Sequence, residues 1–158
     1  MTRREILTGS ASLLALALWG RVAEAAVAGR YAVVRTDAEW RQKLTPTQYA
    51  ILRDQGTEQP RSSPLEAEDR FGYYACGGCD QGLFSSATKF HSDTGWPSFY
   101  APINDALAES ADRTAMVKRT EVHCTKCGSH IGHVFGDGPK PTGLRYCVNG
   151  NAMDFHAT

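Results

Sequence analysis

The sequence predicts a mainly β protein, a small antiparallel β sandwich or barrel preceded by short helices. Short apolar or alternating runs fill the second half of the chain, and turn residues separate them at close intervals. Two Cys-x-x-Cys pairs lie far apart in the sequence, where one metal ion can clip two hairpins together. The length of 158 residues fits one domain, and 42% hydrophobic and 22% charged side chains are ordinary globular usage.

The N-terminus has the order of a cleavable export signal. A basic start with Arg3 and Arg4 is followed by an apolar run too short to span a bilayer, and then by a small-residue cleavage site. The start resembles a twin-arginine signal, the type that exports folded proteins. The alternative is an amphipathic first helix, which Gly20 would interrupt. We expect a signal peptide at 1–25, a mature domain at 26–158, and export, into the periplasm of a bacterium.

Two short helices are predicted after the signal. The first covers 38–43, behind a Thr or Asp cap. The second begins at Thr45, as cap, with Pro46 in the first helical position, and is expected to end at Gly56. The polar, proline-bearing stretch 57–70 is interpreted as a surface loop.

From residue 71 onward the pattern predicts strands joined by tight turns. The expected strands are 71–75, 96–100, 113–119, 133–136, 144–148 and 152–155. The 17 basic and 17 acidic side chains give no net charge, and therefore no basic footprint for nucleic acid or for an anionic membrane. We expect neither as a partner of the mature protein.

Four of the five cysteines form two pairs, Cys76 with Cys79 and Cys124 with Cys127. Four thiolates can hold one tetrahedral Zn²⁺, and a site closed by four protein ligands is structural rather than catalytic. One alternative is two disulfides, since the chain is expected outside the cytoplasm. Another is a thioredoxin-like redox pair, although no βαβ pattern surrounds either motif. Export after folding favours zinc, because the metal can be loaded in the reducing cytoplasm. We expect one structural zinc ion per chain.

The fifth cysteine, Cys147, is left over. In an alternating strand Arg145, Cys147 and Asn149 would share one face, and the guanidinium would favour the thiolate. The competing interpretation is a buried cysteine that acts only as a small hydrophobic residue.

His130 and His133 lie three residues apart and are followed by Asp137. An imidazole titrates near neutral pH, so either histidine can donate a proton to a leaving oxygen. A single histidine is more often structural. We interpret His123 and His156 in that way, because neither belongs to such a group of candidate catalytic residues.

Trp96 lies between a glycine and a proline, on a constrained turn. Its indole face can contact a methyl or thioether group. Taken alone, this residue is better explained as an aromatic side chain of the core or of a chain corner.

These residues resemble the methionine-R-sulfoxide reductase B family over about residues 33–155. The matching motifs are Thr45-Pro46-x-Gln48-Tyr49, the two cysteine pairs, Gly95-Trp96-Pro97-Ser98-Phe99, Gly132-His133-Val134-Phe135-x-Asp137-Gly138 and Arg145-Tyr146-Cys147-Val148-Asn149. The resemblance implies two antiparallel sheets with helices at the N-terminal side, and a zinc ion held by the cysteine pairs. It also implies the thiol-dependent reduction of the R epimer of methionine sulfoxide, free or peptide-bound.

The resemblance also implies a role for each site residue. Cys147 matches the nucleophile and Trp96 the residue that receives the substrate's methyl group. His130 and His133 match the active-site histidines, with supporting polar groups at Asp137, Arg145 and Asn149. The Cys147 thiolate would attack the sulfoxide sulfur while His130 or His133 protonates the departing oxygen. Methionine would leave, and Cys147 would become a sulfenic acid that a thiol must reduce.

The chain departs from many relatives at one position. Those relatives carry a second, resolving cysteine just before the Gly-Trp-Pro segment, and here Thr94 takes its place, next to Asp93 where relatives often have glycine. We therefore expect a cycle with one redox cysteine, in a monomer regenerated by a thioredoxin-like protein or a small thiol. Such an enzyme would repair oxidised exported proteins.

Two other functions compete with the enzyme. The same fold can serve as a zinc-held binding module in which Cys147 is incidental, or as a redox sensor that signals when Cys147 is oxidised. A binding module needs no proton donor beside a thiol, so the paired histidines favour the enzyme.

Overall fold

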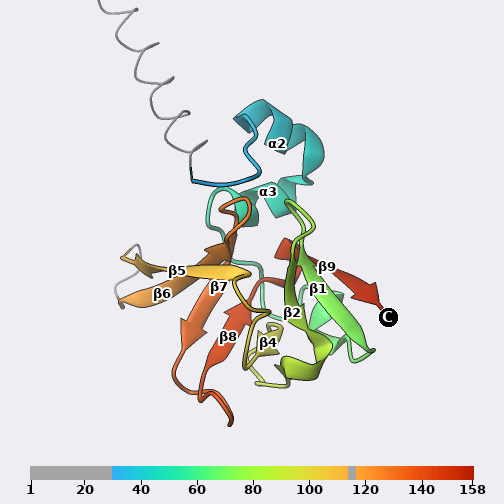
Figure 1. Cartoon of the computed structure of the whole chain (residues 1–158), viewed down its shortest axis with the longest axis vertical. Coiled ribbons are helices and arrows are strands. Elements are labelled where there is room, and N and C mark those ends of the chain that lie inside the picture. The colour runs from blue at the N-terminus through green and yellow to red at the C-terminus, as the bar shows by residue number, and fades with distance from the viewer. Residues whose placement is uncertain (1–29, 114–116) are drawn as a thin grey trace, which may run out of the picture. The chain divides into compact units, whose positions relative to one another are not determined.

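The computed structural model describes residues 30–113 and 117–158, and the compact unit that carries the site runs from Arg35 to Thr158 (Figure 1). The expected signal peptide and its cleavage site lie outside the described residues. Within the two described ranges, every helix is too short or too polar to cross a membrane.

Two helices precede the strands, as predicted. They are α2 (Asp37–Lys43) and α3 (Pro46–Leu52). Each begins with a capping box, in which the side chain of Thr36 or Thr45 accepts a hydrogen bond from the backbone N–H three residues on. Helix α3 packs against strand β7 (His130–Phe135) and against the short 3₁₀ turn η3 (Gly150–Ala152). It therefore closes one end of the sheet that carries the site.

The expected end of the second helix at Gly56 is wrong, because α3 stops at Leu52. Gln55 adopts a positive φ of 56°, and the Gly56 N–H returns to the carbonyl oxygen of Ala50 at 2.8 Å. A residue in the left-handed conformation, followed by a backbone hydrogen bond to the carbonyl six residues earlier, is a common way to end a helix. Here it ends α3 before Gly56 is reached.

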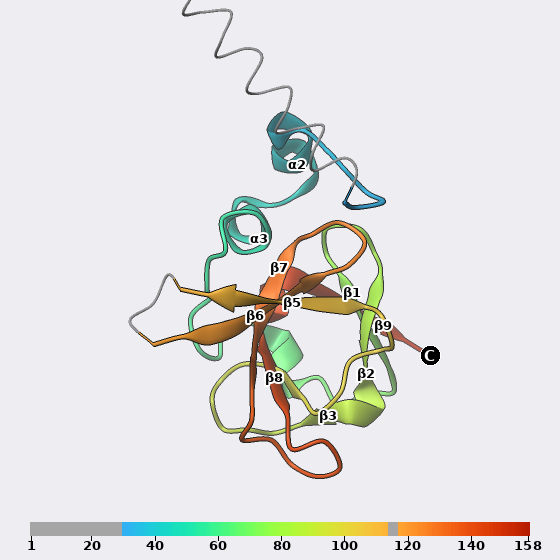
Figure 2. The same ribbon diagram turned by 60° about the vertical axis from the view of Figure 1, so that its left-hand side comes forward.

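The strands form two antiparallel sheets, which confirms the fold class. In spatial order the first sheet contains β2 (Gly82–Ser85), β1 (Gly72–Cys76) and β9 (Met153–Ala157). The second contains β3 (Lys89–Phe90), β4 (Ser98–Phe99), β8 (Arg145–Val148), β7 (His130–Phe135), β6 (Arg119–Cys124) and β5 (Leu107–Asp112). Figure 2 shows β8 and β7 in the middle of the second sheet, with β5 and β6 extending to one side. The 3₁₀ turns are η1 (Pro64–Ala67), η2 (Ser86–Thr88) and η3 (Gly150–Ala152).

The expected strand at 113–119 is wrong. Of its described residues, Arg113 follows β5, 117 and 118 lie outside any strand, and Arg119 is the first residue of β6. The pattern also missed β2, β3, β5 and all of β6 except its first residue. Strand β5 reads Leu-Ala-Glu-Ser-Ala-Asp, a polar sequence at the edge of its sheet, where one side of the strand needs no neighbour and burial imposes little periodicity.

Aromatic side chains fill the space between the two sheets. Phe84 of the first sheet stacks on Phe99 of the second with ring centroids 4.2 Å apart, and Tyr74 meets Phe99 edge-on at 4.9 Å. Tyr146, on β8, lies 5.9 Å from Phe84. Tyr146 and Val148 thus face this core, as predicted, which turns the side chain between them, Cys147, to the opposite face of the sheet.

Candidate active site and metal centre

The four paired cysteines come together from both sheets. Cys76 ends β1 and Cys124 ends β6, and the four Sγ atoms all lie within 4.8 Å of one another. The Sγ atoms of Cys76 and Cys127 are 3.7 Å apart, and those of Cys79 and Cys124 are 3.6 Å apart. A disulfide needs about 2.05 Å, so all four are free thiols.

This cluster fits a tetrahedral metal ion. Metal–sulfur bonds of about 2.3 Å place the sulfurs of a tetrahedron ~3.8 Å apart, close to the separations observed. Ser129 Oγ lies 3.2 Å from Cys127 Sγ, and its hydroxyl can donate to the thiolate, so this side chain orients one of the ligands. The cluster can hold a metal ion that ties one sheet to the other.

Cys147 lies on β8, between β4 and β7, where its Cα partners are Ser98 and His133. It is half-buried and opens onto a cavity of about 150 Å³. The other residues that line this cavity are Thr57, Trp96, Arg119, Gly132, His133, Phe135, Val148 and Asn149. Of the residues predicted for the site, the structure therefore gathers Cys147, His133, Trp96 and Asn149 around one hollow.

Gly132 allows β7 to approach β8 beside this cysteine. A Cβ atom at position 132 would lie 2.3 Å from the carbonyl oxygen of Cys147 and 2.8 Å from Cα of Val148. Both neighbours are backbone atoms that cannot move aside, so only glycine permits this distance between the strands.

Burial raises the pKa of the Cys147 thiol, which differs from the expectation that Arg145 would favour the thiolate. Arg145 does lower this pKa, and so does the Thr94 hydroxyl, whose Oγ1 lies 3.9 Å from Sγ, but burial outweighs both. The sequence shows the positive charge but not how deeply the sulfur lies. At neutral pH the resting residue is therefore mostly a thiol, and its reactivity should increase as the pH rises.

We expect the change Thr94→Val to slow alkylation of Cys147 by iodoacetamide. Loss of the hydroxyl removes a group that lowers the pKa, so the rate at pH 7 should fall about three- to tenfold, less than a well-formed hydrogen bond to a charged group would contribute, because 3.9 Å is long. The rates of the two proteins should converge at high pH, where both sulfurs are ionised. Thr94→Ser keeps the hydroxyl and should behave as wild type. A Val variant that alkylates at the wild-type rate throughout would contradict this role for Thr94.

The two predicted histidines have different surroundings. His133 Nε2 lies 2.8 Å from Asp112 Oδ2, at the end of β5, and its ring contributes to the cavity wall. His130 is buried behind it, with Nδ1 2.8 Å from Glu121 Oε1, and burial lowers its pKa. His133 is thus the histidine placed to exchange a proton inside the cavity.

A register shift between β6 and β7 brings these two rings together. Gly132 pairs with Val122 and His130 with His123, which leaves Ile131 as an extra residue in β7. In a regular strand, residues three apart face opposite sides, and one extra residue reverses that relation. The centroids of the His130 and His133 rings are therefore only 5.4 Å apart.

Arg145 and Asp137 form a bidentate ion pair outside the cavity, with N–O distances of 2.8 and 2.9 Å. Asp137 is largely exposed. The guanidinium lies over the ring of Phe135, with 4.5 Å between Cζ and the ring centroid. Arg145 therefore acts on the site by lowering the pKa of Cys147 and by covering the ring of Phe135. Asp137 holds Arg145 in place, and its own charge opposes ionisation of Cys147.

Asn149 lies just past the end of β8 and is almost fully buried. Its Oδ1 accepts a hydrogen bond from the Glu58 N–H at 3.0 Å, and its Nδ2 donates to the Ile131 carbonyl at 3.1 Å. Trp96 Nε1 donates to the Glu58 carbonyl at 3.1 Å. Both residues that flank Cys147 in the cavity are thus tied to the backbone of Glu58.

Sequence reasoning missed Glu58, Thr57 and Arg119. The first two lie in the stretch interpreted as a surface loop, although Glu58 is only 7% exposed. Arg119 lay within the strand that was placed wrongly, and its guanidinium donates to Asp112 Oδ2 at 2.8 Å, the same oxygen that faces His133. A buried acidic residue in a loop leaves no periodic signal in a sequence.

A larger cavity of about 330 Å³ is lined in part by Gln48, Leu65 and Met153. Its lining residues, all in the described part of the chain, include no cysteine or histidine. Of these two cavities, the smaller one is therefore the one lined by a thiol and an imidazole, those of Cys147 and His133.

A thiol that opens onto a cavity beside an imidazole is typical of enzymes that use cysteine chemistry, and here a separate four-cysteine metal site is part of the same β frame. Comparison with known proteins makes the class specific. A SelR domain matches residues 44–157, which include the cavity and the four-cysteine cluster. The chain belongs to the methionine-R-sulfoxide reductase B family.

The alignments with known relatives cover most of this chain and nearly the whole of each relative. A peptide methionine sulfoxide reductase MsrB of Agrobacterium fabrum is 51% identical over 124 residues, which are 78% of this chain and 92% of the relative. A protein of the same name from Leifsonia xyli is 50% identical over 129 residues, 80% of this chain and 93% of its own. Another, from Methanosarcina barkeri, is 50% identical over 125 residues, with coverages of 78% and 88%.

Proposed function

We propose that this chain, by its family a peptide-methionine (R)-S-oxide reductase, carries out the reduction on Cys147 and restores it with an external thiol. One observation carries the proposal: the Cys147 sulfur opens onto a cavity of about 150 Å³ that also presents Trp96 and His133. A cavity of this size suits the end of one side chain. The substrate is methionine-R-sulfoxide, either free or in a protein.

The first step joins sulfur to oxygen. The Cys147 sulfur attacks the sulfoxide sulfur, and the S–O bond of the sulfoxide breaks. The bond formed between the two sulfurs breaks in turn as methionine leaves, and the oxygen ends on Cys147. The thiol's own proton balances the step, because a thiol and a sulfoxide become a sulfenic acid and a thioether. The enzyme sulfur is oxidised by two electrons and methionine is the reduced product.

His133 is the proton carrier that the geometry favours. It is the Cα partner of Cys147 and lines the cavity, whereas burial lowers the pKa of His130, so that at neutral pH this ring is mostly neutral and has no proton to give. Its Nε2 lies 2.8 Å from the Asp112 carboxylate, which orients the ring. The raised pKa of Cys147 makes such a carrier necessary, because the thiol must lose its proton as it attacks.

Regeneration then requires a thiol from outside. Attack on the sulfenic acid by a thioredoxin-like protein or a small thiol releases water and forms a mixed disulfide, and a second thiol resolves that disulfide. In the described part of the chain the other cysteines are the four of the metal cluster. A cycle with one redox cysteine follows.

We expect the change Thr94→Cys to install an internal disulfide. Thr94 Oγ1 lies 3.9 Å from Cys147 Sγ, so a sulfur at position 94 needs only a small movement to bond. After one equivalent of sulfoxide without reductant, non-reducing peptide mapping should find residues 94 and 147 joined in the variant, and no such bond in the wild type. Wild-type protein that forms a disulfide between Cys147 and a cluster cysteine while keeping its metal would contradict the one-cysteine cycle.

The metal in the cluster is zinc in this proposal, one ion per chain, held by Cys76, Cys79, Cys124 and Cys127. A four-sulfur tetrahedron suits zinc, and all four positions are taken by protein, so the ion serves the fold and not the reaction.

The protein is exported as a folded monomer with its metal in place, and it repairs oxidised proteins in the periplasm of a bacterium. The order of residues 1–25 supports export, and a twin-arginine route would protect the cluster from oxidation before the metal is bound. Detection of the metal-loaded, shortened chain in a periplasmic fraction tests this.

An assay on separated epimers tests the activity itself. Purified protein with dithiothreitol should reduce R-methionine sulfoxide over many turnovers and leave the S epimer unchanged. Repeated turnover also distinguishes an enzyme from a redox sensor, which would stop after one oxidation. Equal reduction of both epimers, or none, would contradict the proposal.

A further inference from the structure

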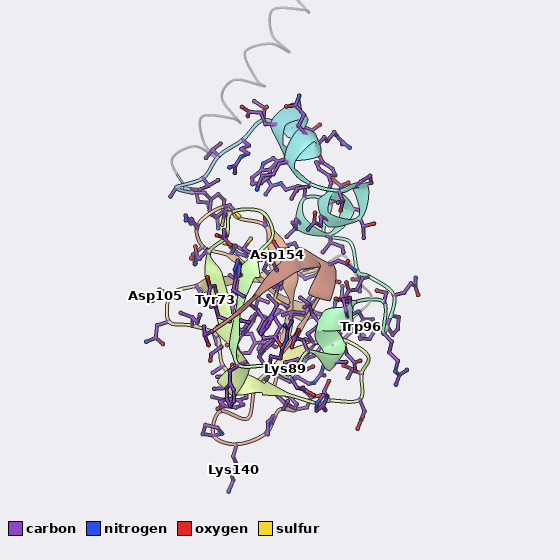
Figure 3. The ribbon with its side chains drawn as sticks, turned by 90° about the vertical axis from the view of Figure 1, so that its right-hand side faces the viewer. Tyr73, Lys89, Trp96, Asp105, Lys140 and Asp154 are labelled. Atoms are coloured by element: carbon purple, nitrogen blue, oxygen red, sulfur yellow. The ribbon has the colours of Figure 1, made fainter. Side chains whose placement is uncertain are left out.

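The loop at residues 57–61 makes unusually close contact with the two residues that flank Cys147. The Arg61 N–H donates to the Gly95 carbonyl at 2.6 Å, next to Trp96, and the Trp96 indole N–H donates to the Glu58 carbonyl. Figure 3 shows Trp96 on the side where η1, the pale green turn that follows this loop, also lies. The backbone of this loop, and not a side chain, is what holds the indole.

The same loop sets the orientation of the Asn149 amide. Because Oδ1 of Asn149 accepts the Glu58 N–H, the amide cannot flip, and its NH₂ group keeps one N–H on the Ile131 carbonyl. Asn149 also lines the cavity, and its NH₂ group carries a second N–H donor. A donor at that position suits the oxygen of a sulfoxide.

The Glu58 carboxylate fixes the loop itself. It is buried and accepts three hydrogen bonds from η3: from the Gly150 N–H at 2.6 Å, the Asn151 N–H at 2.8 Å and the Asn151 Nδ2 at 2.6 Å. Gly150 permits the close packing, because a Cβ atom there would lie 2.2 Å from Ser63 Oγ. Three donors from the residues directly after Asn149 therefore hold the side chain of Glu58, and the backbone of Glu58 in turn holds Asn149 and Trp96.

We propose that Glu58 is a positioning residue of the sulfoxide site: its carboxylate, clamped by η3, fixes the loop whose backbone sets the Trp96 indole and the Asn149 amide. It does not touch the reacting atoms. Its effect is on selectivity, because the wall that receives the S-methyl group is the one that it steadies. This inference rests on the proposed function for the identity of the substrate.

The test compares three variants of the full chain. Glu58→Gln has the same shape, but its NH₂ must face at least one of the three donors. Asn151→Ala is a milder variant that removes one donor and leaves Glu58 intact. Ser63→Ala is the matched control, since Ser63 is buried just after this loop and its hydroxyl accepts a hydrogen bond from the Leu65 N–H, away from Trp96 and Asn149.

Two measurements separate positioning from a merely structural role. The first is the indole N–H resonance of Trp96 in a ¹⁵N-labelled protein, assigned with Trp96→Phe. The second is the ratio of kcat/KM for the R-sulfoxides of methionine and ethionine, which differ by one methylene at the recognised group. A fitted apolar pocket distinguishes one methylene by about tenfold or more, and a loosened wall loses part of that.

We expect Glu58→Gln to shift the Trp96 resonance and to lower the methyl-to-ethyl ratio about five- to tenfold, with smaller changes of the same sign in Asn151→Ala. Ser63→Ala should keep both at the wild-type values even if its melting temperature falls. Glu58→Gln with an unmoved resonance and an unchanged ratio would overturn the inference. If Glu58→Gln does not fold, an Asn151→Ala variant that keeps both wild-type values would overturn it equally.

The proposed function can fail separately. Wild-type protein that reduces neither sulfoxide would overturn that function and the selectivity claim with it. The indole resonance does not depend on turnover, and an unmoved resonance in Glu58→Gln would overturn the positioning of Trp96 in that case too.

Discussion

Replacing Cys147 with serine should abolish sulfoxide reduction while leaving the fold intact. Serine has nearly the same shape, but a hydroxyl oxygen cannot take the sulfoxide oxygen to form a sulfenic acid. Loss of a nucleophile of this kind costs about a thousandfold or more in turnover. The residue is half-buried at the edge of a cavity, so the change removes little packing. Turnover with dithiothreitol, the circular dichroism melt and the metal content together check this result.

The same variant distinguishes the enzyme from a binding module. In a binding module Cys147 is incidental, and its replacement would leave every function of the chain unchanged. Residual sulfoxide reduction near the wild-type rate in Cys147→Ser would mean that the chemistry lies elsewhere.

Removal of the metal, or of one of its ligands, should unfold the domain. Cys124 is fully buried at the end of β6, and the cluster joins this sheet to the one that contains β1. A structural zinc ion contributes ~10–16 kcal/mol to the folding of zinc-finger peptides. This is comparable with the whole stability of a typical domain, ~5–15 kcal/mol. The Cys124→Ser variant should therefore lack bound metal and be unfolded, with no cooperative transition in a thermal melt.

Cys147→Ser serves as the matched control, because it removes a thiol without removing a metal ligand. A chelator strong enough to strip zinc should reproduce the effect of Cys124→Ser in the wild-type protein. A metal-free protein that melts at the wild-type temperature would show that the cluster does not hold the fold.

Local sequence rules predicted the parts of the fold that local chemistry determines. Thr45 with Pro46 begins α3 because capping and proline geometry act within one turn. Alternation placed Tyr146 and Val148 in the core, and hence Cys147 on the opposite face. The edge strand β5 was not predicted, because it depends on its neighbour in the sheet. The early end of α3 was not predicted either, because it depends on the backbone angle of Gln55.

The site followed the same division. Four cysteines in two pairs predicted a cluster, and the structure assembles it from both sheets. Depth was not visible in the sequence, so the guanidinium of Arg145 was expected to dominate the pKa of Cys147, and burial dominates instead. Glu58 was invisible because its role comes from contacts with residues 149–151, about ninety positions further along the chain.

A single-turnover experiment without reductant tests the central claim most directly. The protein is mixed with one equivalent of R-methionine sulfoxide and with dimedone, which traps sulfenic acids, and its cysteines are then mapped by mass spectrometry. The account predicts one methionine released per chain and one dimedone adduct, on Cys147, with the four cluster cysteines unmodified. Release of methionine while Cys147 remains an unmodified thiol would contradict it.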